Sequence, residues 1–154
     1  MLTLRQLLDK KGHQVWSVNS GSTVFGALRM MAEKGIGALP VVDQGNLVGV
    51  VSERDYARKV ILEGRSSKDT LVAAIMTSKV IHLSPAHTVQ DAMGLMTDKR
   101  IRHLPVVDNG AISGIVSIGD LVKQIIEEQA FVIDQLESYI SGEHWSISRR
   151  SHVM

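Results

Sequence analysis

The sequence predicts an α/β (α+β) fold made of two tandem β-α-β-β-α repeats, packed pseudo-symmetrically and followed by a long C-terminal helix. The main observation is an internal sequence repeat. Shifted by 65 residues, residues 15–55 align with residues 80–120 without a gap, and 17 of these 41 positions carry the same residue. A unit of this length cannot easily bury its apolar face alone. We therefore expect the two copies to share one core and to present two similar clefts.

The bulk composition excludes several classes of function. The 154 residues are 44% hydrophobic, enough for one compact domain or two lobes, and the net charge of 17 − 16 = +1 argues against nucleic acid or a membrane as partner. Cysteine is absent, which excludes disulfides. No apolar run approaches the roughly 20 residues of a membrane span, and the N-terminus lacks a signal-peptide profile. We expect a soluble cytoplasmic protein.

Hydrophobic periodicity and turn residues give the order of elements in each copy. In the first copy we expect a strand at 15–18, a helix at 23–34 between an N-capping Thr23 and a terminating Gly35, strands at 39–42 and 47–52 joined by a hairpin, and a helix at 53–62. In the second copy we expect a strand at 80–83, a helix at 88–99 and strands at 104–107 and 112–117. The resulting division is a lead-in helix at 1–14, repeat 1 at 15–62, a linker with a short helix (71–76, leading into repeat 2) at 63–79, repeat 2 at 80–141, and a flexible tail at 142–154.

The last predicted helix is longer than its counterpart in repeat 1. From Asp120 to about Ile140 there is no Gly or Pro. A mainly apolar stripe follows one face: Val122, Ile125, Ile126, Gln129, Val132, Ile133, Leu136 and Ile140. The stripe either packs on the core of its own chain or packs on a second chain, as in a coiled coil.

The repeated motif resembles the cystathionine β-synthase (CBS) domain. The residues that carry the resemblance are Leu-Pro-Val-Val-Asp at 39–43 and 104–108, each followed by Gly-x-Val-Ser-x-x-Asp at 49–55 and Gly-x-Val-Ser-x-x-Asp at 114–120. Two such copies in tandem look like a CBS pair, and the similarity covers about 15–56 and 80–122 together with the lead-in helices. The stretches 52–60 and 101–105 resemble those of stand-alone bacterial CBS-pair proteins.

The two Ser-x-x-Asp motifs each close a strand and open a helix. From the residues alone, a capping box is favoured, in which the Ser accepts an N–H and the acid lies in the positive first turn. A carboxylate can also accept hydrogen bonds from both hydroxyls of a ribose. The resemblance implies this second role for Asp55 and Asp120, and the two roles are compatible.

The resemblance further implies two clefts that cross between the repeats, with a base pocket from one repeat and the ribose Asp from the other. The first cleft would contain Val80, Ile81, Ile101, Arg102 and His103 together with Ser52, Arg54 and Asp55. The second would contain Val15, Trp16, Ile36, Gly37 and Ala38 together with Ile115, Ser117, Gly119 and Asp120. From the residues alone, the Pro-containing segments are plain edge strands.

This crossing makes the two clefts unequal. The first would hold Arg54, Arg102 and His103, and arginine matches phosphate oxygens bidentately, although Arg102 could simply be solvated. The second has Gly119 and Gly37 at matching positions, so any cation there must come from elsewhere, for example a partner chain. The first cleft is therefore suited to a phosphorylated adenosine.

No pattern of residues predicts catalysis or a metal. The histidines lack metal-binding spacing, and phosphate-binding and nucleophile motifs are missing. We therefore expect no enzyme, no metal and no catalytic cofactor, but a homodimeric regulatory or signal-transduction module that binds an adenine nucleotide: AMP first, then NAD, ATP or ADP, with S-adenosylmethionine less favoured. It would act on an unidentified client protein. The alternatives are a structural adaptor or dimerisation module with vestigial clefts and, least favoured, a nucleotide-processing enzyme.

Overall fold

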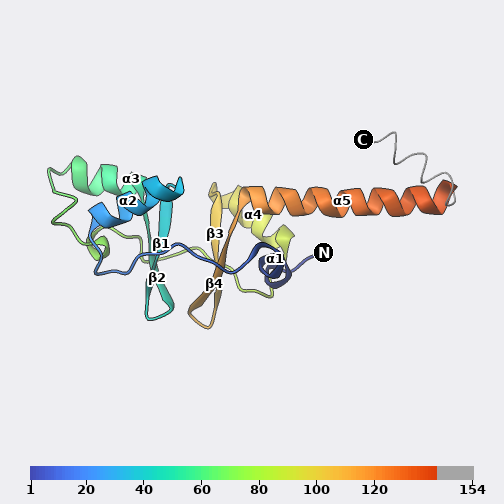
Figure 1. Ribbon diagram of the computed structural model, residues 1–154, viewed down its shortest axis with the longest axis horizontal. Coiled ribbons are helices and arrows are strands. Elements are labelled where there is room, and N and C mark those ends of the chain that lie inside the picture. The colour runs from blue at the N-terminus through green and yellow to red at the C-terminus, as the bar shows by residue number, and fades with distance from the viewer. Residues whose placement is uncertain (142–154) are drawn as a thin grey trace.

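The computed structural model describes residues 1–141, which form an α+β chain around one four-stranded antiparallel sheet of order β1-β2-β4-β3 (Figure 1). This confirms the predicted fold class, and the predicted tail at 142–154 lies outside the described residues. The elements in order are α1 (Leu4–Lys11), α2 (Val24–Lys34), β1 (Ala38–Asp43), β2 (Asn46–Ser52), α3 (Glu53–Tyr56), the π-helix η1 (Ala57–Ile61), the 3-10 helix η2 (Val72–Ala74), α4 (Val89–Lys99), β3 (His103–Asp108), β4 (Ala111–Ser117) and α5 (Ile118–Ser141).

The two long repeat helices begin and end where capping chemistry predicts. The Oγ1 atoms of Thr23 and Thr88 accept hydrogen bonds from backbone N–H groups three residues later, which satisfies part of the free N-terminus of α2 and α4. At the other end, Gly35 and Arg100 adopt the left-handed conformation, with φ of 66° and 56°. The predicted helices at 23–34 and 88–99 are confirmed, with each Thr serving as the cap.

The predicted hairpins are also present, and their tips join the two repeats. Gln44 and Gly45 have φ of 52° and 82°, the signature of a two-residue turn whose twist matches that of the flanking strands. At the tips, Leu47 N donates to Gly110 O at 3.1 Å and Ile112 N donates to Gly45 O at 3.3 Å. The two hairpins therefore combine into one sheet through their turn ends.

The strands predicted at 15–18 and 80–83 are wrong in length. Only Val18 and Leu83 bridge to the sheet, each in parallel to the outer strand of its own repeat, at Val41 and Val106. The remaining residues of the two predicted strands have no strand pairing.

The prolines explain why these strands stop after one residue. Val18 N donates to Pro40 O at 3.1 Å, and Val42 N donates to Val18 O at 2.8 Å. The next step of a parallel ladder would require an N–H on Pro40 to reach Trp16 O, and proline has none. Pro105 imposes the same limit in repeat 2.

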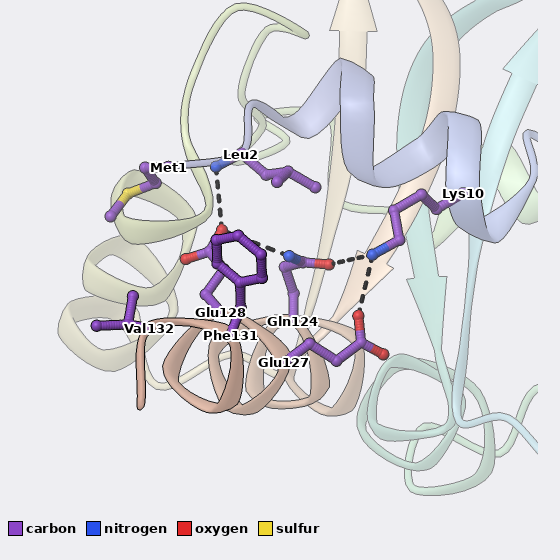
Figure 2. A pocket seen from close by; sticks show the side chains of 8 residues that line it. All are labelled: Met1, Leu2, Lys10, Gln124, Glu127, Glu128, Phe131 and Val132. Atoms are coloured by element: carbon purple, nitrogen blue, oxygen red, sulfur yellow. Dashed lines mark hydrogen bonds and ion pairs between the residues drawn. The ribbon is translucent and has the colours of Figure 1, made fainter. Parts of the chain in front are cut away.

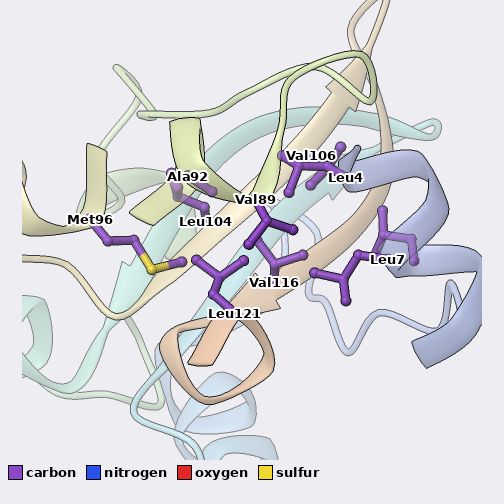
Figure 3. Close-up of a cluster of buried hydrophobic side chains, with 10 residues drawn as sticks. Leu4, Leu7, Val89, Ala92, Met96, Leu104, Val106, Val116 and Leu121 are labelled. Carbon is purple, nitrogen blue, oxygen red and sulfur yellow. The ribbon is translucent and has the colours of Figure 1, made fainter. Parts of the chain in front are cut away.

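The repeats have two separate cores, so the expectation of one shared core is wrong. Each core is completed by a segment that precedes the other repeat. The repeat 2 core contains Leu4, Leu7 and Leu8 of α1 together with Val89, Ala92, Met96, Leu104, Val106, Val116 and Leu121 (Figure 3). The repeat 1 core contains Val72 and Ile75 of the 71–76 segment together with Val18, Val24, Ala27, Met31, Leu39, Val41, Val51 and Val60.

Backbone hydrogen bonds fix both exchanged segments in the same way. Val89 N donates to Leu2 O at 3.0 Å, and Val24 N donates to Thr70 O at 2.8 Å. The segment predicted to be a helix leading into repeat 2 is therefore helical only at η2 and packs on repeat 1. The N-terminal α1 takes the equivalent place on repeat 2.

The glycine that both repeats carry in their inner strand is required by this packing. A Cβ atom on Gly114 would lie 2.6 Å and 2.9 Å from the two Cδ atoms of Leu8. A Cβ atom on Gly49 would lie 2.7 Å from Met76 Sδ and 3.0 Å from Thr77 O. The repeated Gly is thus the point where each exchanged segment approaches the sheet.

Helix α5 leaves its own core after two turns. Leu121 is buried and Gln124 is 4% exposed, but Ile126, Ile133 and Leu136 are 59%, 55% and 54% exposed. The alternative in which the whole stripe packs on its own chain is therefore wrong. In Figure 1 the distal part of α5 extends well beyond the sheet and the other helices.

We expect Gly114→Ala to lower the free energy of unfolding by about 1–3 kcal/mol, because the new methyl group overlaps Leu8. Gly94→Ala is the matched control: no atom lies within 4 Å of its added Cβ, and it sits inside α4. The control should be stabilising by about 0.5–1 kcal/mol. Urea denaturation followed by circular dichroism measures both. If Gly114→Ala were as costly in a Leu8→Ala background, contact with Leu8 would not be the cause.

Candidate functional site

The first Ser-x-x-Asp motif forms a complete capping box at the start of α3. Asp55 N donates to Ser52 Oγ at 3.1 Å, while Ser52 N and Ser52 Oγ donate to Asp55 Oδ2 at 2.9 Å and 3.0 Å. Lys59, one turn later, lies 3.4 Å from Asp55 Oδ1. The capping role predicted from the residues is confirmed, and it leaves the carboxylate half-buried at the strand-to-helix turn.

The second motif repeats this arrangement at the start of α5 and adds a distant cation. Ser117 N donates to Asp120 Oδ2 at 2.8 Å, and Asp120 N donates to Ser117 Oγ at 3.1 Å. Lys11 Nζ, at the C-terminal end of α1, donates both to Asp120 Oδ2 and to Ile115 O at 2.6 Å. The cation beside Asp120 therefore comes from the same chain, and Lys11 was not among the predicted site residues.

Burial and neighbouring charges shift the pKa values of Asp120 and His103. Partial burial alone would raise the pKa of Asp120, but Lys11 and the Ser117 N–H hold this pKa below its ordinary value. Desolvation, followed by the positive charges of Lys11 and Arg102, lowers the pKa of His103, with Asp120 opposing the shift. Lys11 therefore acts on both the Asp120 carboxylate and the His103 ring, and the lowered pKa of His103 favours its neutral form.

Each predicted base edge lies beside the Ser-x-x-Asp motif of its own repeat. Glu53 N donates to Gly37 O at 3.0 Å, and Ile118 N donates to Arg102 O at 2.8 Å. In the sheet register, Ala38 is opposite Ser52 in the same way that His103 is opposite Ser117. The pairing of each edge with the Asp of the other repeat stays a prediction.

The other predicted site residues lie at the surface or partly buried. Trp16 is 42% exposed, and Lys34 Nζ lies 3.8 Å from the centre of its ring, a cation–π contact. Partly buried residues are Val15, Val80, Ile36, Ile101 and Ile115, and exposed residues are Ile81, Arg54 and Gly119. Trp16 thus offers an aromatic face at the edge of repeat 1, part of which Lys34 covers.

Sequence reasoning missed the two basic residues that follow from the position of α1. Besides Lys11, His13 lies against β4, with Nδ1 2.8 Å from Ser113 O and Nε2 2.9 Å from Asp9 Oδ1. Both bonds raise the pKa of His13, the side-chain bond to Asp9 more strongly. These residues precede the aligned part of repeat 1, so the only available signal was the short amphipathic helix that ends at Lys11 and precedes His13.

A pocket of about 450 Å³ lies on the opposite side of α1, between this helix and α5 (Figure 2). Its lining residues are Met1, Leu2, Lys10, Gln124, Glu127, Glu128, Phe131 and Val132. Lys10 Nζ donates to Gln124 Oε1 at 2.9 Å and to Glu127 Oε2 at 3.0 Å, and Leu2 N donates to Glu128 Oε1 at 3.1 Å. These bonds fasten both ends of α1 to α5.

Residues 1–141 contain neither a metal-binding cluster nor a helix that could span a membrane. Their histidines and carboxylates contain no group of three arranged to hold a metal ion. Among the helices in this range, none has both the length and the apolar character needed to cross a bilayer.

The repeats, the paired capping carboxylates and the two-hairpin sheet define a tandem-repeat α+β fold, and its family can be assigned. The sequence profile of the CBS domain matches residues 4–62 and 72–127, which together are most of the chain. The chain belongs to the CBS-domain family.

Individual relatives agree with this assignment. The mitochondrial CBS domain-containing protein CBSX3 of Arabidopsis thaliana is 43% identical over 150 residues, covering 91% of this chain and 72% of its own length. A solved structure from Burkholderia ambifaria MC40-6, provisionally described as a signal-transduction protein with CBS domains, is 49% identical, with a TM-score of 0.72 over 82% of this chain and 96% of that one. The CBS pair of protein MJ0100 shares the fold, at 24% identity and a TM-score of 0.67 over 83% and 98% of the two chains.

We expect Lys11→Met to raise the pKa of Asp120, because the effect of burial then loses its strongest opponent. The lowered pKa stabilises the fold above the unfolded value of 3.8 and ceases to do so as the pH falls through the folded value. The variant should therefore lose less stability on acidification. Carbon-detected NMR titration of the Asp120 carboxyl measures the shift, and Lys10→Met is the control. An unchanged pKa would show that the ion pair does not persist in solution.

Proposed function

We propose that this protein is a regulatory module that binds adenine nucleotides at its two Ser-x-x-Asp sites and signals through the angle between its repeats. AMP is the first choice of ligand, followed by NAD, ATP and ADP, with S-adenosylmethionine less favoured. The observation that carries the proposal is the pair of half-buried carboxylates, Asp55 and Asp120, at equivalent turns of two equivalent repeats.

The hydrogen bonds of each carboxylate leave room for a ribose. Asp55 accepts two hydrogen bonds from Ser52 at Oδ2. Its Oδ1 atom forms an ion pair with Lys59 Nζ at 3.4 Å, and the Lys59 side chain is partly exposed. Asp120 Oδ2 accepts hydrogen bonds from Lys11 Nζ and from Ser117 N. In both sites, Oδ1 can accept a hydroxyl hydrogen while Oδ2 continues to cap the helix, since each carboxylate oxygen has two lone pairs. Capping fixes the carboxylate in place, which reduces the entropic cost of binding.

The relatives support a regulatory rather than a catalytic role. The Burkholderia protein is described in terms of signal transduction, and the MJ0100 pair was crystallised with 5′-methylthioadenosine and S-adenosyl-L-methionine. The second similarity supports an adenosine ligand only through the shared fold. Our proposal keeps the crossed arrangement of the two clefts and an unidentified client protein. It also keeps a cytoplasmic, bacterial setting, although one relative is a plant mitochondrial protein.

A ligand that contacts both repeats can change the balance between two repeat–repeat arrangements only if it binds one of them better. The hairpin tips provide the only paired strand contact between the repeats in the described sheet, at Asn46 and Ala111. Because this contact is confined to one end of the sheet, the opposite ends, where Ser52 and Ser117 lie, can approach or separate. A bound nucleotide would favour one separation.

Asp55→Asn and Asp120→Asn should each weaken AMP binding, by about tenfold or more, because a charged acceptor for the ribose is lost. Asp91→Asn is the matched control. Asp91 forms the same capping box with Thr88 at the start of α4, with bonds of 3.0 Å and 3.1 Å, but lies outside both clefts. Calorimetric titration measures the affinities, and thermal melts compare the cost of losing each cap.

The control separates capping from binding. If all three variants lost stability alike and none changed AMP affinity, the carboxylates would be helix caps only. The protein would then be the structural adaptor with vestigial clefts. Conversion of AMP to another product by the purified protein would instead support the nucleotide-processing enzyme.

The protruding face of α5 is the second part of the proposal, and we assign it to a homodimer. The exposed members of the stripe repeat at a spacing close to seven residues, with Val122, Gln129 and Leu136 in one row and Ile126, Ile133 and Ile140 in another. This spacing is typical of helices that pack on one another. Burial of each large apolar side chain contributes roughly 1.5–3 kcal/mol.

Ile133→Glu combined with Leu136→Glu should yield a folded monomer, because both side chains are more than half exposed in the single chain. Leu62→Glu is the matched control, since Leu62 is 77% exposed but lies at the end of η1, away from α5. Light scattering gives the mass, and circular dichroism checks the fold. A monomeric unmutated protein at micromolar concentration would contradict the homodimer.

A further inference from the structure

The C-terminal turn of α1 presents Lys11 to the Asp120 site in a defined orientation. An ammonium group has three N–H donors. Two of the Lys11 donors are used, for Asp120 Oδ2 and for Ile115 O, both at 2.6 Å. The Lys11 side chain is 37% exposed and that of Asp120 is 25% exposed, so the pair faces solvent. One donor of Lys11 therefore remains for an acceptor that approaches from outside.

The position of Lys11 is held by the buried leucines of α1 and not by the surface bonds of Lys10. The preceding Lys10 points to the other side of α1 and bonds Gln124 and Glu127 of α5 (Figure 2). The leucines of the same helix are buried in the repeat 2 core. Lys11 is thus carried by a rigid element, which lowers the entropy lost when it forms a further bond.

The neighbours of the pair set the chemistry of the ligand. Asp120 Oδ1 is an acceptor suited to a hydroxyl, and Lys11 adds a donor with full positive charge within a few ångströms of it. His103 lies opposite Ser117 in the sheet, and the charges of Lys11 and Asp120 both act on its ring. A ligand that carries vicinal hydroxyls and an anionic group a short distance away matches both halves of this pair.

We infer that Lys11 is a specificity-determining residue of the Asp120 site, which it makes selective for adenosine ligands bearing a phosphate over the uncharged nucleoside. The inference rests on the proposed function, and it adds a residue from outside the repeat motif to the site. Adenosine can use the carboxylate alone, whereas AMP can also accept a charge-assisted hydrogen bond from Lys11. Loss of one such bond reduces affinity by about tenfold or more.

The test compares AMP and adenosine by calorimetric titration of the full chain in an Asp55→Asn background, which isolates the Asp120 site. Four proteins are titrated: the background alone and the background with Lys11→Met, Lys11→Arg or Lys10→Met. Lys10→Met removes the same charge one residue away and so controls for long-range attraction of the anion. The unmutated chain is titrated as well, to test the proposed function itself.

We expect the background to bind AMP at least tenfold more tightly than adenosine. Lys11→Met should abolish this preference chiefly by weakening AMP, Lys11→Arg should restore most of it, and Lys10→Met should leave it unchanged. An unchanged ratio in a Lys11→Met protein with native circular dichroism overturns the inference, as does an equal loss in Lys10→Met. A background that binds neither ligand also overturns it. If the unmutated chain binds neither ligand, the proposed function fails as well.

Discussion

The fold depends on an exchange between its two halves: neither repeat buries its own apolar face without a segment that precedes the other. Leu8 on one side and Met76 on the other fill equivalent places against Gly114 and Gly49, at distances that leave no room for a side chain on the glycine. The two cores are separate, yet each draws on both halves of the chain. Loss of either exchanged segment therefore opens one core without directly exposing the other.

The same exchange assembles the Asp120 site. The motif itself supplies a carboxylate and its capping partners, all within four residues of one another. The cation comes from more than a hundred residues away because α1 must lie on β4 to complete the core. Packing and ligand chemistry are thus connected at Lys11. The Asp55 site differs, since its cation, Lys59, lies one turn later on η1, which directly follows the helix that the motif begins.

Local chemistry explains why most elements could be predicted from the sequence. Caps such as Thr23 and Thr88 and the turns at Gly45 and Gly110 act over three or four residues, so the pattern contains all the information. The predicted length of the first strand of each repeat was wrong, because its pairing depends on the neighbouring strand. There, Pro40 and Pro105 lack the N–H that a longer ladder requires. Both capping boxes followed from the residues of the motif alone, whereas the family resemblance implied the ribose role of the two carboxylates, which stays a prediction.

The sequence did not predict which repeat each lead-in segment packs on. The apolar face of α1 indicates that it is buried, but periodicity does not say against which repeat. For that reason Lys11 and His13 were missed, although both follow at once when α1 is placed on β4. The sequence showed the apolar stripe on α5, but only the exposure of Ile133 and Leu136 in the structure could separate its two possible partners.

The placement of α1 has a consequence for the order in which the chain becomes structured during synthesis. Residues 4–11 leave the ribosome before the two repeats do, but their packing site includes Leu121, more than a hundred residues later. At elongation rates of about 5–20 residues per second, the helix waits roughly 5–20 s for its site. Repeat 1 needs only residues up to Ile75 and can form meanwhile. The three buried leucines of α1 therefore stay uncovered after the core of repeat 1 can already have formed.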